Sequence, residues 1–429
     1  MMMRTSAAAF DCLPSLDGAV GTGRRHVAGQ TRPSPAVYQV EWQPLCQLAT
    51  IVDQWDDLSA RVLEPNIFYE PALALRAASM FGADAGAVLV WSRSIPSRLL
   101  GLFPLRITRQ RHGGTLSILT GWTHPLARLG TPLIDRNRAA DVIEAFLDYL
   151  SANRRLPGLV LLPLMAEQGA VATLFRQILE RRGHRLACLE RHNRSLLVPT
   201  AGRLDYLERS LGPGRLSELH RLRRRLEATG PVRLLTATQR PAVIAALGEL
   251  LTLEASTHKP SVEAETAAQS EINACVRSGL AALAARGQVR IDRLMVANRT
   301  LAVAVTLLSE GTAWLWRIAH DETLTRVSAA QPFALKFTHS LLADATIVRV
   351  DCCGGTHHEA IDHMWRERLT LSDWLIAARP GLSLSFPLAL QLESLRGSMA
   401  NAGKRLNALA GRCGAPHGGL RSAAATPVG

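Results

Sequence analysis

The spacing of hydrophobic and polar positions divides the first half of the chain into alternating helices and strands. Apolar residues recur at helical spacing in four segments, 45–62, 71–81, 139–150 and 170–182. Shorter apolar runs predict strands at 87–91, 99–107, 159–164 and 185–190. We therefore expect an ordered N-terminal half over residues 36–200.

Residues 201–378 form a second segment with a more regular pattern. Four leucines lie near one stripe of a helix whose other faces carry arginines: Leu216, Leu219, Leu222 and Leu226. Helices are also expected at 241–255, 267–286 and 332–342, and strands at 232–235, 289–292, 301–308, 314–318 and 347–351. The order β-α-α-β-β-β-α-β-α is typical of an α/β fold with one mixed sheet.

The two ends of the chain lack any such periodicity. Residues 1–35 and 379–429 consist largely of small residues and scattered arginines. Segments of this composition bury too little apolar surface to offset their ordering entropy. We expect a disordered N-terminal tail and a basic, largely disordered C-terminal tail.

Composition narrows the class of protein. Hydrophobic residues make up 47% and charged residues 20%, which is ample for a core. No apolar run reaches the roughly 18 residues that span a bilayer, and the N-terminus has no sustained apolar segment of a secretory signal. We expect a cytoplasmic protein without a transmembrane segment.

The net charge of +13 comes almost wholly from arginine, since only Lys259, Lys336 and Lys404 are lysines. It is compatible either with a solvated arginine-rich surface or with attraction for a phosphate-bearing cofactor or polyanion. Nucleic acid is not the expected partner. The seven cysteines show no CxxC spacing, and no HExxH motif occurs, so no metal site is expected.

Three residues of the second segment are candidates for catalysis. Glu254 shares a helical stripe with apolar residues, and desolvation there would raise its pKa toward that of a general base. The alternative is a helix-end carboxylate paired with His258 or Lys259. Asp351 ends a predicted strand and is followed by the glycines at 354 and 355. It is either a site residue or a residue that caps the loop. His358 begins a helix, as either a proton shuttle or a structural histidine.

Two further assignments concern cysteine and tryptophan. Cys352 or Cys353 would serve as an acyl-accepting nucleophile only with a lowered thiol pKa and a base nearby, and we treat this route as a minor alternative. The tryptophans at 314, 316 and 365 lie in predicted apolar elements. We assign all three to the core.

Several stretches, taken in order, resemble a known family. The chain has Trp55 with Leu58, then "EPNIF" at 64–68, "GLFPL" at 101–105 and "GTPL" at 130–133. An arginine-rich helix at 219–230, "LEA" at 253–255, "WRIAHDE" at 316–322 and "HEAIDHMWRER" at 358–368 follow. Together, these stretches resemble the motifs of bacterial CelD-type acetyltransferases of the GNAT superfamily, and the resemblance extends over residues 37–376. The resemblance implies two tandem GNAT-like halves.

The same resemblance implies a cofactor and a site. Acetyl-CoA or another acyl-CoA would be the donor, with pantetheine along the strand at Trp316 and Ile318. Its diphosphate would lie on the loop before the 332–342 helix, at Arg326, Ser328, Ala330 and Gln331, because helix N-termini favour anions. Lys259 would contact the acceptor. The chain departs from the family pattern at two places near this expected site. The family's Trp-Lys-Gly-rich loop is replaced by "STHKPS" at 256–261, and its "SPG" is replaced by "SAAQP" at 328–332.

The expected activity is acyl transfer from acyl-CoA to an amine or hydroxyl. By the resemblance, the acceptor is a small molecule or a glycan precursor in exopolysaccharide or cellulose production. Two alternatives stay open. One is a FemABX-like transferase that uses aminoacyl-tRNA, for which the arginine-rich helix at 221–225 would bind phosphates. The other is a non-catalytic scaffold in polysaccharide synthesis.

Overall fold

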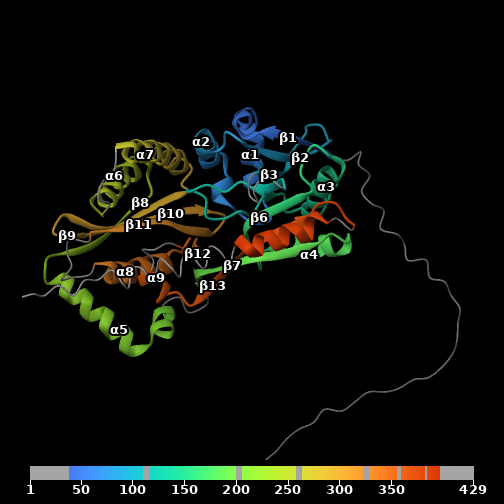
Figure 1. The fold of residues 1–429 in the computed structure, drawn as a ribbon. Helices are drawn as coiled ribbons and strands as arrows, with labels where there is room; N and C mark the ends of the chain where they lie inside the picture. Colours follow the sequence, from blue (N-terminus) through green and yellow to red (C-terminus); the bar gives the residue numbers. More distant parts are fainter. Residues whose placement is uncertain are drawn as a thin grey trace, which may run out of the picture. The chain divides into compact units, whose positions relative to one another are not determined.

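The computed structural model describes residues 38–109, 116–199, 205–257, 263–321, 329–354, 359–381 and 384–396. Within these ranges, thirteen strands form one mixed sheet in the order β1-β2-β3-β4-β6-β13-β7-β12-β11-β10-β9-β8, with β5 beside β3 (Figure 1). The predicted class, an α/β fold with a mixed sheet, is confirmed.

The strands alternate with helices along the chain. The strands of the first half are β1 (Tyr38–Pro44), β2 (Ala85–Ser92), β3 (Leu99–Thr108), β4 (Ile118–Gly121), β5 (Leu133–Ile134), β6 (Leu159–Ala166) and β7 (Leu186–Leu197). Those of the second half are β8 (Val232–Ala237), β9 (Val289–Val296), β10 (Arg299–Ser309), β11 (Thr312–His320), β12 (Arg349–Asp351) and β13 (Glu367–Ala377).

The helices pack on both faces of this sheet. The first half has the 3-10 helices η1 (Leu45–Ile51) and η2 (Ile67–Tyr69), with α1 (Val52–Ser59), α2 (Pro71–Phe81), α3 (Ala139–Ala152) and α4 (Ala170–Arg181). The second half has α5 (Tyr206–Glu227), α6 (Arg240–Thr257), α7 (Glu263–Ala284), α8 (Ala330–Ala343) and α9 (Glu359–Asp362). None of the described helices is both long and apolar enough to cross a bilayer.

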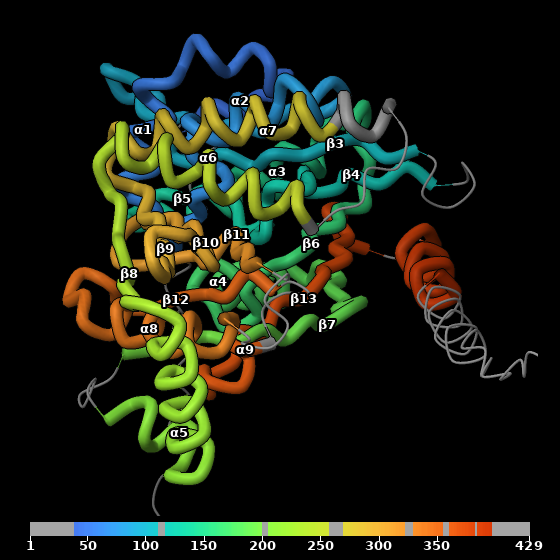
Figure 2. Tube along the Cα trace, turned by 90° about the vertical axis from the view of Figure 1, so that its left-hand side faces the viewer, coloured from blue at the N-terminus to red at the C-terminus, as the bar shows by residue number. Residues whose placement is uncertain are grey.

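The two halves exchange strands at the middle of the sheet. β13, from the end of the second half, lies antiparallel between β6 and β7 of the first half. β7 in turn pairs with β12 at Val350 and Asp351. The hydrogen-bonded sheet is therefore continuous across the sequence junction near residue 200, and Figure 2 shows β7, β13 and β12 as neighbours.

The core of the second half has two layers because both faces of the sheet are covered. Along β10, Val303 and Val305 belong to the cluster formed with α6 and α7, while Ala302 and Ala304 belong to the cluster formed with α5 and α8. Figure 1 shows α6 and α7 on one face of these strands and α5 and α8 on the other. A strand buried on both faces requires a nearly continuous apolar run. This is the sequence pattern that predicted a central strand here.

The C-terminal region departs from expectation in one part. We expected residues 379–429 to be largely disordered, yet residues 385–396 are helical. Phe386 and Ala389 of this helix are buried against Leu159 and Leu375 of the sheet. The local pattern did not indicate this helix because its anchoring contacts are made with strands far away in the sequence.

Candidate active site

A bulge interrupts the pairing of β11 with β10 at the centre of the second half. Pairing with β10 shifts register between Val305 and Thr306, which face Arg317 and Leu315, so Trp316 is an extra residue in β11. A bulge bends a strand and disturbs its hydrogen-bonding ladder. On the other edge, β12 pairs with β11 only over Thr312–Trp314.

The two parallel strands β11 and β12 thus separate after three paired residues. Among the described residues, no strand pairs with this edge of β11 from Leu315 to Ala319. Backbone N–H and C=O groups inside a fold normally have hydrogen-bond partners. The edge is therefore a place where an extended ligand with amide groups can add its own hydrogen bonds.

The start of α8 lies at the same end of β11. Its first residues follow β11 in a parallel β-α-β crossover, which brings the helix N-terminus to the C-terminal end of the strand. The N-cap residue Ala329 makes no side-chain cap, and Phe333 N–H donates to Ala329 O at 2.9 Å. The N–H groups of Ala330 and Gln331 precede this first helical bond, and such a helix start favours an anion.

Gln331 adds an unusual feature to this helix start. Its side-chain Oε1 is buried and makes no hydrogen bond within the part of the chain that the structure describes. Buried polar atoms are usually satisfied, and residues 322–328, which precede this helix start, lie outside the described part of the chain. Arg326 and Ser328, also predicted here, lie outside the described residues, so their roles stay predictions.

The side chains of the bulged strand point into the core. Trp316 is 4% exposed, and its indole N–H donates to Leu126 O of the first half at 2.9 Å. Ile318 packs against the α5–α8 side of the sheet. Only their backbone atoms are thus available at the strand edge. Trp314 and Trp365 are buried as well, which confirms the assignment of the three tryptophans to the core.

Glu254 lies at this strand rather than within the apolar stripe of its helix. Val243, Leu247 and Leu250 of α6 are buried, whereas the Glu254 side chain is 26% exposed. Its Oε2 lies 3.3 Å from Nη1 of Arg317, the residue after the bulge. His258 and Lys259, the partners considered from the sequence, lie outside the described residues, so pairing with either of them stays a prediction.

Asp351 is buried in an ion pair at the end of β12. It is 2% exposed, and its Oδ2 accepts a hydrogen bond from Arg194 Nη2 at 2.6 Å. Its Oδ1 accepts from Cys353 N–H at 2.9 Å, which is the loop-capping alternative raised by the sequence. Burial raises the pKa of Asp351, and the Arg194 guanidinium opposes that rise. A catalytic role for Asp351 stays a prediction.

The turn after Asp351 is held in a sparsely populated backbone conformation. Cys353 has φ 58° and Gly354 φ 56°, and non-glycine residues in this region are strained. Arg194 Nη1 donates to Cys353 O at 3.3 Å, so one arginine holds both the carboxylate and the turn. His358, the remaining catalytic candidate, lies outside the described residues.

The two cysteines of this turn do not meet the requirements of a nucleophile. Both side chains are buried. Burial raises the pKa of the Cys352 thiol to about 11 and also raises that of Cys353. Since the thiolate is the reactive form, the geometry disfavours the acyl-cysteine route.

A segment of the first half that the sequence did not single out completes the site. Asn66 Nδ2 donates to Thr131 O at 2.8 Å, and Asn66 Oδ1 accepts from Phe68 N–H at 3.1 Å. Asn66 thereby holds the segment 122–131, whose Leu126 accepts the Trp316 hydrogen bond. The sequence signals here were the "EPNIF" stretch at 64–68 and the "GTPL" stretch at 130–133. Arg194 and Arg317 were also missed, because arginine is abundant throughout this chain.

Comparisons with known proteins agree with this geometry. Residues 214–358, about a third of the chain, match the family model described as "Acetyltransferase (GNAT) domain". No protein of curated function matches the sequence. The crystal structure of FemX superposes with a TM-score of 0.51 and 9% identity, covering 80% of this chain and 98% of FemX.

Two other solved structures have lower TM-scores. A tandem GNAT protein from the clavulanic acid pathway gives 0.37 at 12% identity, covering 80% of this chain and 100% of that one. The C-terminal domain of a putative lysylphosphatidylglycerol synthetase from Agrobacterium fabrum gives 0.46 at 13% identity, covering 80% and 95%. Residues 214–358 are therefore similar to the GNAT-type acetyltransferase domain, and the fold of the chain is similar to that of FemX.

Proposed function

We propose that the protein is an acyl-CoA-dependent acyltransferase that acylates an amine or a hydroxyl group. The observation that carries the proposal is the separation of β11 from β12 beside the uncapped start of α8. An unpaired strand edge suits the amide-containing pantetheine arm, and a helix start suits the diphosphate. The matched GNAT domain supports the same donor.

The residues present fit such a donor. The backbone of Trp316 and Ile318 would receive pantetheine, and the N–H groups of Ala330 and Gln331 would receive the diphosphate. Arg326 and Ser328 are proposed to add charge and a hydroxyl to the same loop. When bound, acyl-CoA supplies a thioester, an activated acyl group that an amine or alcohol can attack.

Proton transfer is assigned to Glu254. Its carboxylate is partly exposed and is held beside the bulge by Arg317. A carboxylate in that position can take the proton that an attacking amine or hydroxyl releases. His358 and Asp351 are proposed as supporting groups, with the buried Asp351–Arg194 pair fixing the turn at the end of β12. Lys259 is proposed to contact the acceptor.

By the resemblance to CelD-type enzymes, we propose a sugar or glycan precursor as the acceptor. The test is release of free CoA from acetyl-CoA and longer acyl-CoAs, measured with an added amino sugar, a neutral sugar or neither. Acceptor-dependent, saturable release supports the proposal. Absence of release with every donor and acceptor, in a protein that is folded, would count against an enzyme and for the scaffold alternative.

An aminoacyl-tRNA-dependent transferase is the second candidate. The observation in its favour is α5, where Arg221, Arg224 and Arg225 are exposed along one helix. Exposed arginines bind phosphates in a salt-dependent way. A thermal-shift screen that includes tRNA and acyl-CoAs of graded length separates the two donors. Stabilisation by tRNA alone, decreasing with salt, would favour this candidate.

A further inference from the structure

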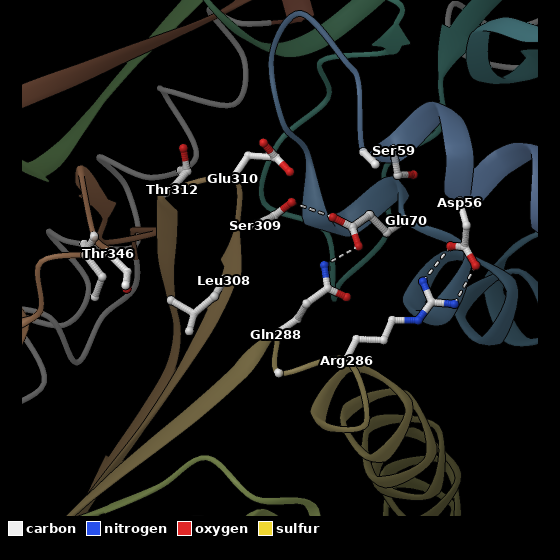
Figure 3. Close-up of a pocket in the computed structure, with 14 residues that line it drawn as sticks. Asp56, Ser59, Glu70, Arg286, Gln288, Leu308, Ser309, Glu310, Thr312 and Thr346 are labelled. Atoms are coloured by element: carbon white, nitrogen blue, oxygen red, sulfur yellow. Dashed lines mark hydrogen bonds and ion pairs between the residues drawn. The ribbon is translucent and has the colours of Figure 1, made fainter.

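A polar cavity lies at the other end of β10 and β11, beside the turn that joins these strands. Its volume is about 480 Å³, within the range of roughly 300–1,000 Å³ typical of small-molecule sites. Its walls come from α1, the start of α2, the segment after α7 and the β10–β11 turn (Figure 3). Both halves of the chain therefore contribute, and the cavity is separate from the unpaired edge of β11.

The central group of this cavity is the carboxylate of Glu70. The residue is 4% exposed, and its oxygens accept hydrogen bonds from Ser309 Oγ at 2.7 Å and Gln288 Nε2 at 2.6 Å. Both donors are neutral, and burial raises the pKa of Glu70. Within the described part of the chain, no cationic side chain forms an ion pair with it. Buried carboxylates are rarely left without a cation.

The nearby arginine is already committed to another acid. Arg286 forms two hydrogen bonds with Asp56, at 2.5 and 2.6 Å, which neutralises that carboxylate (Figure 3). At the rim, Glu310 is 49% exposed and lies 4.0 Å from Arg136. Among the described carboxylates of the cavity, Glu70 is therefore the one without an ion-pair partner, while Glu310 is paired with Arg136 near solvent.

A second observation concerns Gln288. Its Nε2 is used by Glu70, but its Oε1 is buried and has no hydrogen-bond partner among the described residues. An unsatisfied acceptor beside an unpaired carboxylate calls for a group that carries positive charge and several donors. A primary ammonium group has three N–H donors and one positive charge.

The described carboxylates around this cavity do not form a group of metal ligands. Among the described residues, the one group of three with the spacing of metal ligands is Glu190, His192 and Asp373. Asp56, Glu70 and Glu310 are thus too far apart to hold one ion together. The cavity volume and the hydroxyls of Ser59 and Thr312 suit an organic cation with further polar groups instead.

We propose that this cavity binds a small hydroxylated amine, whose ammonium group pairs with Glu70 and donates to Gln288 Oε1. A second polar end of the ligand faces Glu310 at the rim. This inference does not depend on the proposed acyl transfer, because the cavity lies at the opposite end of the strands.

The test uses 1,3-diamino-2-propanol and glycerol, which share a skeleton and differ in carrying ammonium or hydroxyl groups at the two ends. Binding is measured by isothermal titration calorimetry with the full chain. We expect saturable binding of the diamine and none of glycerol. The variant Glu70→Gln, which keeps the shape but removes the charge, is expected to weaken binding about tenfold or more.

Two further variants keep the test decisive. Glu310→Gln changes only the rim of the cavity and replaces Glu70→Gln in the test if that variant fails to fold. We expect Glu310→Gln to lower the affinity for the diamine by a smaller factor. Glu271→Gln makes the same chemical change on the exposed surface of α7 and is expected to bind like the wild type. Equal affinity for glycerol, or unchanged diamine affinity in both cavity variants, would overturn the proposal.

Discussion

The indole N–H of Trp316 donates a hydrogen bond to the carbonyl of Leu126, and this bond joins the bulged position of β11 to the first half of the chain. The two residues are 190 positions apart in the sequence. Trp316 is the extra residue of the bulge, so this bond holds its side chain at the point where the pairing of β10 and β11 shifts register. The first half thus acts on the candidate site through packing at the bulge.

Replacing Trp316 by phenylalanine should therefore affect both stability and activity. Trp316→Phe removes the donor and leaves the buried Leu126 carbonyl unpaired, a loss of about 1–3 kcal/mol in the free energy of unfolding. We also expect slower acyl transfer, because the bulge is less firmly held. Denaturant unfolding and CoA release measure the two effects. Trp91→Phe, which removes an indole bond to Glu41 on an outer strand, should leave activity unchanged.

Glu254→Gln tests the assignment of the proton acceptor. The amide keeps the size of the side chain but cannot take a proton, so turnover should fall by roughly 10²–10⁴-fold while acyl-CoA affinity changes little. Steady-state kinetics and acyl-CoA titration separate these quantities. Glu249→Gln on the same helix is the control, since Glu249 pairs with Arg293. An unchanged rate in Glu254→Gln would remove Glu254 from the mechanism.

His124 should make stability depend on pH. It is 7% exposed, its ring stacks on Phe81, and neither ring nitrogen has a hydrogen-bond partner in the described chain. Burial lowers the pKa of His124 from 6.5 to about 4. Below pH 6.5 the unfolded chain takes up a proton that the folded chain does not bind until near pH 4. Stability is therefore lost as the pH falls between these values.

The magnitude follows from the size of the shift. At about 1.4 kcal/mol per pH unit, roughly 3 kcal/mol is lost across that interval. His124→Phe should lose less stability between pH 7 and pH 5 than the wild type does, as measured by urea unfolding at both values. His192→Phe, at an exposed position, should retain the wild-type dependence. An equal loss of unfolding free energy between pH 7 and pH 5 in His124→Phe and in the wild type would contradict this account.

Cysteine reactivity checks the burial of the turn after β12. Cys352 and Cys353 are buried with raised thiol pKa values, and Cys275 is also buried, whereas Cys46 is exposed. Iodoacetamide at pH 8 should modify Cys46 first and reach Cys352 and Cys353 only after unfolding, as read by peptide mass spectrometry. Rapid native labelling of Cys352 or Cys353 would restore the acyl-cysteine route.

Local sequence patterns predicted much of the fold. The apolar run 301–308 became the buried part of β10, and the stripe predicted for 332–342 became most of α8. These elements follow from periodicity within one segment, which the sequence displays directly. The tryptophans of β11 were assigned to the core for the same reason.

Long-range contacts could not be predicted in this way. The insertion of β13 between β6 and β7 depends on pairing between segments about 200 residues apart, which no local period reveals. The partners of Glu254 and Asp351 are likewise distant arginines, 63 and 157 positions away. The sequence therefore indicated the candidate carboxylates but not the groups that hold them.

Titration of acetyl-CoA into the full-length protein tests the central proposal most directly. The wild type should bind saturably. Arg326→Ala should bind up to about tenfold more weakly, because a charge-assisted phosphate contact is lost. Arg233→Ala on β8 should bind like the wild type. No heat of binding for acetyl-CoA, or the same affinity in Arg326→Ala as in Arg233→Ala, would contradict a diphosphate site at the start of α8.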